Sequence, residues 1–274
     1  MPVGGRITGG LAPVASLWEV VYDADLTAQG DSGTLNDDAQ PVIAGKTWLV
    51  KSGADSDYCS GFEINSSGLQ IRIENGDAKS EQKTSTDTVP KIEILVSDLL
   101  GGSAPGFDDT LAFQVVQSST GMNDNWFTQG LTVRGAATKW VANRTLYFTG
   151  YTSGNVGHDV MKGDDERLAP LANYGTGSSE PGLRETVWHC GSSSFVLGAN
   201  ISGSLVDPLN CTSLEVLTTV DSASATNIAP SPTIAITPSA AKLQIIAAHE
   251  DETGGLASPW TATFTRIRVL RRKK

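Results

Sequence analysis

The sequence is poor in charge and in long apolar runs. Charged residues make up only 18% of the 274 positions, and acidic residues outnumber basic ones, so the formal net charge is -10 at pH 7. An acidic chain does not bind nucleic acid through counterion release, so no nucleic-acid partner is expected. An uninterrupted apolar run of roughly 18 residues, which a membrane-spanning helix needs, is missing, so no membrane partner is expected either.

Several motifs of metal, redox and nucleophilic chemistry are also missing. The three cysteines, Cys59, Cys190 and Cys211, form no CxxC pair, and the three histidines show no HExxH spacing. His189 and Cys190 are adjacent, and neighbours in a strand face opposite sides of a sheet, so a catalytic couple is not expected there. The glycine doublets lack the lysine of a phosphate-binding loop. We therefore expect no cofactor and no resident metal.

Period-2 alternation is what the sequence has in abundance. In Gly61–Glu74, GFEINSSGLQIRIE, apolar and polar residues alternate on both sides of an Asn-Ser-Ser-Gly turn, which predicts an antiparallel hairpin with one buried face. In Trp260–Leu270 the apolar parity switches near Thr265-Arg266, which predicts a β-bulge. Sustained helical periodicity is missing, and the best helical candidate is the short segment Asp164–Leu171.

The strand pattern predicts an all-β fold. Roughly a dozen strands without intervening helices favour antiparallel sheets packed as a two-sheet jelly-roll sandwich, with the first and last strands side by side. We expect a single domain over residues 17–270. A Gly/Pro-rich arm at residues 1–16 precedes it, and a basic tail at residues 271–274 follows it.

The order of these strands resembles the concanavalin A-like, or laminin-G-like, jelly roll. The hairpin FEINSSGLQI and the final strand TATFTRIRVLRR carry most of the resemblance, together with the order of five segments: Trp18–Asp23, Gly61–Ile73, Ile92–Asp98, Leu111–Val115 and Trp260–Leu270. Proteins of this family bind glycans, cleave glycans or serve as structural modules, so the resemblance alone selects no function.

The acidic residues do not form the pattern that the family's retaining hydrolases carry. Glycoside hydrolysis needs two carboxylates that flank one bond, and these enzymes place them in an E-x-D-x-x-E or E-x-D-x-E strand. The nearest predicted strand, Lys91–Ser97, offers Glu93 alone. The densest acidic cluster, Asp164-Asp165-Glu166, lacks EF-hand spacing and is expected to be a solvated loop or helix start. We therefore expect that the chain is not an enzyme.

A candidate glycan site begins with Trp126. This tryptophan lies in the loop-like stretch NDNWFTQG and is the best candidate for an exposed stacking platform, with burial or a subunit contact as the alternative. Residues 150–185 show no clear alternation and are predicted to be a functional loop. They add four members to the candidate glycan site: Tyr151, Asp164, Asp165 and Tyr174.

The last nine positions hold six of the 20 basic residues. Four of the six are predicted to pair with an acidic partner, which includes another copy of this chain: Arg266, Arg268, Arg271 and Arg272. A solubilising tail is the alternative interpretation.

These features favour a non-enzymatic structural component of a bacteriophage virion. The chain resembles such proteins in its Gly/Ser/Thr-rich composition, its all-β pattern and its arm-like ends. It would decorate a capsid or form part of a fibre or tail, through contacts with other virion proteins and with copies of itself. A homo-oligomer is expected, and a trimer on family grounds. No secretory signal is recognisable, so synthesis in the host cytoplasm is expected. The first alternative is a glycan-binding receptor-recognition module, and the second is a polysaccharide-cleaving enzyme.

Overall fold

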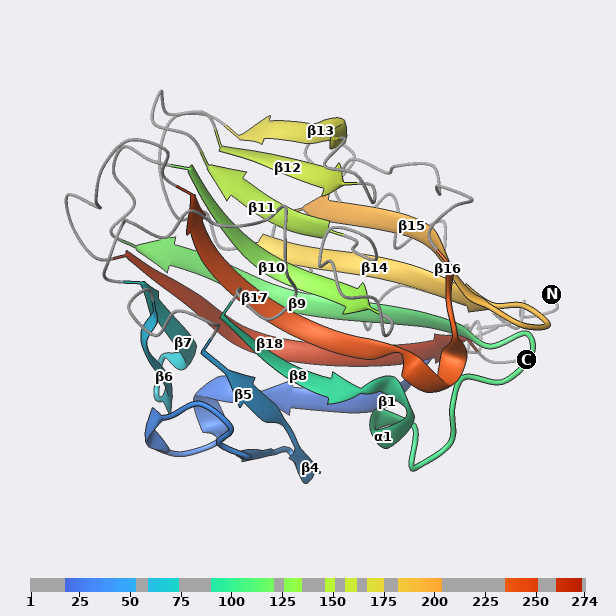
Figure 1. Ribbon diagram of the computed structural model, residues 1–274, viewed down its shortest axis with the longest axis horizontal. Helices are drawn as coiled ribbons and strands as arrows, with labels where there is room; N and C mark the ends of the chain where they lie inside the picture. The colour runs from blue at the N-terminus through green and yellow to red at the C-terminus, as the bar shows by residue number, and fades with distance from the viewer. Residues whose placement is uncertain are drawn as a thin grey trace, which may run out of the picture.

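The computed structural model describes most of the chain as antiparallel sheet. The described residues are 18–52, 59–73, 90–120, 126–134, 146–150, 156–161, 167–174, 182–203, 235–250 and 260–272. They form two large antiparallel sheets stacked face to face, with a two-stranded sheet beside them (Figure 1). The predicted two-sheet sandwich is therefore confirmed. The predicted arm at residues 1–16 lies outside the described residues and stays a prediction.

One layer is a nine-stranded sheet. Its strands are β1 (Trp18–Asp25), β2 (Gly33–Leu35), β6 (Cys59–Asn65), β7 (Gly68–Ile73), β9 (Thr110–Thr120), β14 (Gly182–Cys190), β15 (Phe195–Gly203), β16 (Ala235–Ile236) and β18 (Trp260–Arg272). They run in the order β16-β15-β14-β9-β18-β7-β6-β2, and β1 also pairs with β18. The strand β18 has β9 along one edge and β7 and then β1 along the other. The side-by-side placement of the first and last predicted strands is confirmed.

The other layer is a seven-stranded sheet. Its strands are β5 (Leu49–Lys51), β8 (Lys91–Leu95), β10 (Trp126–Arg134), β11 (Leu146–Gly150), β12 (Val156–Met161), β13 (Arg167–Tyr174) and β17 (Lys242–Glu250). Figure 1 shows their order from top to bottom, β13-β12-β11-β10-β17-β8-β5.

Few helical turns accompany the sheets in the described part of the chain. The remaining elements are η1 (Leu26–Ala28), β3 (Val42–Ile43), β4 (Lys46–Thr47), α1 (Val96–Leu99) and η4 (Pro238–Ala240). None of these described helices is long and apolar enough to cross a membrane.

The core lies between the two large sheets. Phe113 and Phe264 from the nine-stranded sheet and Ile92 and Ile245 from the seven-stranded sheet belong to one cluster of buried side chains. Because successive strand residues point to opposite faces, the alternate residues of each strand face outward. The two outward faces are therefore the sheet surfaces that do not belong to the core, and a binding site on either sheet would use them.

The predicted hairpin is confirmed as β6 and β7. Asn65 pairs with Gly68, and Ile64 pairs with Leu69, so the turn closes on Ser66-Ser67. Gly68 has a φ of 114°, and a Cβ there would lie 2.3 Å from the carbonyl oxygen of Phe264 in β18. Glycine is required at this position because the neighbouring backbone occupies the space of a side chain.

The predicted bulge in β18 is also confirmed. The register between β18 and β9 shifts between Phe264 and Arg266, so Thr265 is the extra residue. Phe264 before the bulge and Ile267 after it are both fully buried. The bulge therefore turns the apolar side chains in the second half of the strand toward the core, although they lie on the other parity in the sequence.

Two local predictions are wrong. The helix predicted at Asp164–Leu171 is not formed, because β13 begins at Arg167 and pairs with β12; residues 164–166 lie outside the described part. The strand predicted over Lys91–Ser97 ends at Leu95, where its ladder with β17 ends, and Val96 starts α1. Tertiary pairing decides both cases against the local pattern. The functional loop predicted over residues 150–185 is wrong as well, because β12, β13 and the start of β14 lie within it.

Candidate functional site

Three polar residues on the outer face of the seven-stranded sheet are buried. Lys91 and Glu93 of β8 and Gln244 of β17 are only 3%, 6% and 4% exposed, although their strand neighbours Ile92 and Ile94 are the ones that face the core. Gln244 lies directly opposite Glu93 in the ladder. Lysine and glutamate are almost never buried unless they are paired, so this place in the sheet is unusual.

The Glu93 carboxylate is held by two donors. Lys242 donates from Nζ to Oε1 at 2.7 Å, and Gln244 donates from Nε2 to Oε2 at 2.5 Å. Burial raises the pKa of the Glu93 carboxyl. The hydrogen bond and charge of Lys242, aided by Gln244 and by the charge of Lys91, outweigh burial and hold that pKa below its usual value. Glu93 is therefore ionised at neutral pH, and each of its oxygens keeps a lone pair for a further hydrogen bond.

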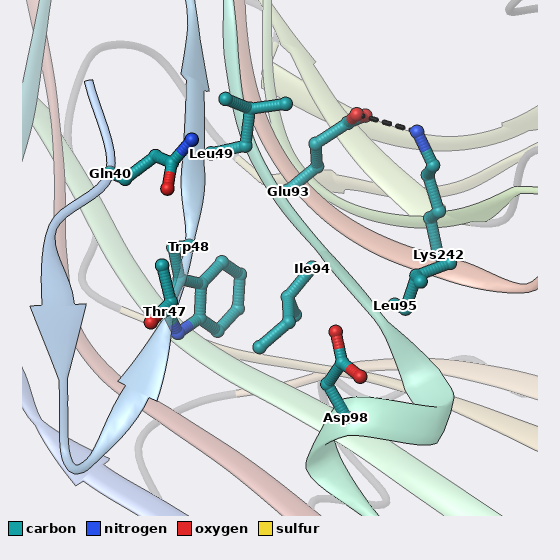
Figure 2. A pocket seen from close by; sticks show the side chains of 9 residues that line it. All are labelled: Gln40, Thr47, Trp48, Leu49, Glu93, Ile94, Leu95, Asp98 and Lys242. Atoms are coloured by element: carbon teal, nitrogen blue, oxygen red, sulfur yellow. Dashed lines mark hydrogen bonds and ion pairs between the residues drawn. The ribbon is translucent and has the colours of Figure 1, made fainter. Parts of the chain in front are cut away.

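A pocket of about 260 Å³ opens beside this ion pair. Figure 2 shows the side chains that line it. The pocket forms because β5 pairs with β8 only over Leu49–Lys51. The preceding residue, Trp48, does not continue this ladder, and its N–H donates to the carbonyl oxygen of Pro41. The chain before β5 thus leaves the sheet edge. Nine residues line the pocket: Gln40, Thr47, Trp48, Leu49, Glu93, Ile94, Leu95, Asp98 and Lys242.

The pocket combines an apolar base with a polar rim. Trp48 is fully buried and Ile94 nearly so. Figure 2 shows the Glu93–Lys242 pair at one end and the Asp98 side chain, which comes from α1, at the other. An apolar concavity with a few placed polar groups is the usual form of a small-molecule site. Two carboxylates beside one pocket are also what glycoside hydrolysis uses.

The pocket wall opposite β8, which includes Thr47 and Trp48, is held in place by two buried hydrogen bonds and one exposed one. Trp48 donates from Nε1 to the hydroxyl oxygen of Tyr22 at 3.1 Å, and that hydroxyl donates to the carbonyl oxygen of Ile43 at 2.9 Å. Burial raises the pKa of Tyr22 to about 12, so this hydroxyl keeps its proton. Lys46 donates from Nζ to the backbone oxygen of Asp98 at 2.6 Å and links the two-stranded sheet to α1. The pocket is therefore preformed.

A second charged group lies on β1 and β18 of the nine-stranded sheet. Arg266 donates from Nε and from one terminal nitrogen to the two Asp23 oxygens at 2.8 and 2.7 Å. Nε of Arg268 lies 3.4 Å from the same carboxylate. The Arg266 hydrogen bonds are the main reason that the pKa of Asp23 is lowered.

Three of the four arginines predicted to bind a partner thus contact carboxylates of the chain itself. Besides Arg266 and Arg268, Arg271 lies 3.9 Å from carboxylate oxygens of both Glu19 and Asp109. Arg272 is exposed. Binding of another protein through these arginines stays a prediction.

The predicted glycan residues are only partly placed. Trp126 begins β10 opposite Glu250, and Tyr174 ends β13 opposite Val156, so both belong to the seven-stranded sheet. The expected loop around Trp126 is therefore a strand from that residue onward. The other three residues lie outside the described part of the chain: Tyr151, Asp164 and Asp165.

The sequence analysis noted Glu93 but missed its partners. Lys242 and Gln244 lie 149 and 151 residues further along the chain. The only signal was the shared parity of Lys91 with Glu93 and of Lys242 with Gln244, which puts each pair on one face of its strand. His189 is exposed and Cys190 is buried, so the two neighbouring side chains face opposite sides of β14. The expectation that they form no catalytic couple stays a prediction.

Comparison with known proteins finds similarity in structure but not in sequence. No family model matches the chain. No curated protein matches it either. Three similar solved structures are jelly-roll sandwiches, a fold that this chain shares. An alginate lyase from Corynebacterium sp. is 10% identical at a TM-score of 0.42, over 77% of this chain and 80% of that one. An alginate lyase of polysaccharide lyase family 7 is 11% identical at a TM-score of 0.45, and the match covers 89% of this chain and 94% of that one. A family 16 glycosyl hydrolase protein from Mycobacterium smegmatis is 9% identical at a TM-score of 0.41, and the match covers 92% of this chain and 100% of that one.

The expectation that the chain is not an enzyme has to be corrected. The structures similar to it include alginate lyases and a glycosyl hydrolase family protein, which contradict that expectation. The error has a definite source, because a missing E-x-D-x-x-E motif excludes only one arrangement of catalytic carboxylates. The virion role has no support in these similarities and stays a prediction.

Proposed function

We propose that this chain cleaves a polysaccharide on the outer face of its seven-stranded sheet, beside the pocket between β5 and β8. The observation that carries the proposal is the Glu93 carboxylate, which faces away from the core, is nevertheless buried, and is bound by Lys242 and Gln244. A carboxylate perturbed by burial and by specific partners next to a pocket is a typical mark of a functional site.

The chemistry needs a group that takes up a proton. In hydrolysis the proton comes from the attacking water, and in an elimination it comes from a carbon of the sugar ring. Glu93 can take this role because its carboxylate is ionised at neutral pH, and its lowered pKa makes it a weaker base than an unpaired carboxylate. The Lys242 ammonium at 2.7 Å from Glu93 lies where it can stabilise negative charge that builds up on the substrate.

A polymer fits this surface better than an isolated small molecule. The outer face continues from the pocket edge across β8, β17 and β10. With neighbouring strands about 4.8 Å apart, the distance from β5 to β10 is about 14 Å, which is enough for several sugar units. The pocket would anchor one sugar unit, and the rest of the polymer would follow the sheet face beyond it.

The test is depolymerisation by the purified chain and by Glu93→Gln. A panel of neutral and acidic polysaccharides is incubated with each protein, and new reducing ends and unsaturated ends are measured. Hydrolysis gives reducing ends alone, whereas elimination also gives ultraviolet-absorbing unsaturated ends. We expect Glu93→Gln to lose cleavage and Glu63→Gln, a glutamate of β6 in the nine-stranded sheet, to keep it. Full activity in Glu93→Gln would refute the assigned role. A wild-type chain that binds a polymer without cleaving it would instead be a glycan-binding module.

A further inference from the structure

The pocket has the size of a single sugar ring. Its volume of about 260 Å³ corresponds to roughly nine water molecules at about 30 Å³ each. This is below the range of roughly 300–1,000 Å³ that is usual for pockets holding drug-sized ligands. A disaccharide would therefore have to extend out of the pocket and over the sheet.

The lining matches a sugar in polarity. Leu49, Ile94 and Leu95 supply apolar surface, and the Gln40 amide and the Thr47 hydroxyl supply hydrogen-bonding groups on the wall opposite β8 (Figure 2). A pyranose has the same division, because its ring carbons expose C–H bonds while its hydroxyls surround the ring. Apolar surface combined with a few oriented polar groups gives a pocket its specificity.

The charges of the lining decide which sugar is accepted. Glu93 and Lys242 neutralise one another across 2.7 Å. The third charged lining residue is Asp98, whose side chain is exposed and, among the described residues, has neither an ion pair nor a hydrogen bond. Lys46, which is not among the lining residues, donates to the backbone oxygen of Asp98 and not to its carboxylate. An ionised carboxylate only accepts hydrogen bonds, so Asp98 favours a ligand that donates them and disfavours one that is an anion.

We infer that this pocket binds one uncharged sugar residue, whose hydroxyl groups donate to the Asp98 carboxylate, and that it rejects sugar acids. The inference rests on the proposed function for its connection to a polymer, and it adds the class of sugar that occupies the anchoring position. An anionic residue of the same polymer would have to lie elsewhere on the sheet.

The test is a binding titration of the full chain with methyl glycosides, followed by ligand-observed NMR. The glycosides are uncharged hexosides of gluco, galacto and manno configuration and the uronic acid counterpart of each. For wild type, we expect at least one hexoside to bind about fivefold or more tightly than its uronic acid. Asp98→Ala should weaken the hexoside about five- to tenfold, because it removes the acceptor. Asp98→Asn keeps an oxygen and removes the charge, so it should bring the two affinities closer together.

A matched control separates local from general effects. Asp31→Asn changes an exposed aspartate in the loop before β2 that does not line the pocket, and it should leave both affinities unchanged. Thermal unfolding of each variant verifies that the sheets are intact. The inference is overturned if no hexoside binds, if uronic acids bind as tightly as hexosides, or if neither Asp98 variant changes the affinities.

The same proteins distinguish this inference from the proposed function. A wild type that binds a hexoside through Asp98 but depolymerises nothing would refute the proposed function and support the subsite. A wild type that depolymerises through Glu93 but prefers uronic acids would refute the subsite alone.

Discussion

Each large sheet carries a carboxylate held by basic side chains, and the two differ in what lies next to them. Asp23, on β1, is bound at both oxygens by Arg266 and approached by Arg268. Glu93, on β8, is bound by Lys242 and Gln244. The pKa of each carboxyl is lowered, by the Arg266 hydrogen bonds at Asp23 and, against the opposing effect of burial, by Lys242 at Glu93.

The difference is that Glu93 lines the pocket beside β5 and β8, whereas Asp23 is not among the residues that line it. The Asp23 contacts join β1 to its ladder partner β18, which is a structural connection. Glu93 also joins two strands, but one side of it faces a preformed concavity. A perturbed pKa alone therefore does not identify a functional carboxylate, and access for a ligand has to be added. Four predictions test this comparison, beginning with the largest expected effect.

Glu93→Gln should lower the rate of polysaccharide cleavage by about 100-fold or more, because the proton acceptor is lost. Asp23→Asn should change that rate less than about twofold, since the contacts of its carboxylate in the described part of the chain are with Arg266 and Arg268. Initial rates of reducing-end formation measure both variants. Equal losses in the two variants would remove the functional distinction between the sheets.

Asp23→Ala should lower the free energy of unfolding by about 2–4 kcal/mol. The loss follows because Arg268, whose side chain is 3% exposed, would be left as a buried charge without its carboxylate. Urea denaturation measures the change. Glu93→Gln should cost less stability than Asp23→Ala, because the Lys242 side chain, at 39% exposed, can turn toward water. The reverse ranking would contradict the structural assignment of Asp23.

Lys242→Met should move the acid limb of the pH–activity profile to higher pH. Lys242 is the main group that lowers the pKa of Glu93 against burial, so its removal lets the pKa rise. The same lowered pKa also affects the stability of the wild type. It contributes to the free energy of unfolding above the unfolded-state pKa of about 4.3, and this contribution is lost as the pH falls through the folded-state pKa of Glu93. Arg266→Met is the control, and it should leave the acid limb in place. An unchanged limb in Lys242→Met would exclude Glu93 as the titrating group.

The smallest effect is expected at a charged pair that is both exposed and away from the pocket. Lys51 donates to Asp38 at the surface, with the two side chains 35% and 69% exposed. Lys51→Ala should change the free energy of unfolding by less than about 0.5 kcal/mol, because exposed ion pairs contribute little. The measurement is the same urea denaturation. A loss of unfolding free energy equal to that of Asp23→Ala would show that burial does not decide how much these two ion pairs contribute to stability.

Local features of the fold were predictable because their causes are local. The hairpin of β6 and β7 follows from alternation around a glycine-ended turn, and the bulge at Thr265 follows from the parity switch in a single strand. Residues 156–161 and 167–174 form β12 and β13 without that pattern, so their strand character comes from pairing with neighbours. The end of β8 at Leu95 is set in the same way, by where β17 begins.

The site was not predictable, because it depends on strand order. Glu93 becomes a candidate only when Lys242 and Gln244, 149 and 151 residues away, are brought beside it by the β8–β17 ladder. The pocket depends in addition on the departure of Trp48 from the sheet edge. Apart from hairpins such as β6–β7, period and composition do not say which of more than a dozen strands are adjacent.

The position of β18 has a consequence for biosynthesis. This strand separates β9 from β7 and β1, yet it follows all of them in the chain. On the ribosome the earlier strands emerge while the centre of their sheet is still missing, so β9 and the β6–β7 hairpin have open edges until translation reaches residues 260–272. Pairing partners this far apart in sequence also slow folding. The nascent chain should therefore depend on protection by a chaperone until its last strand is inserted.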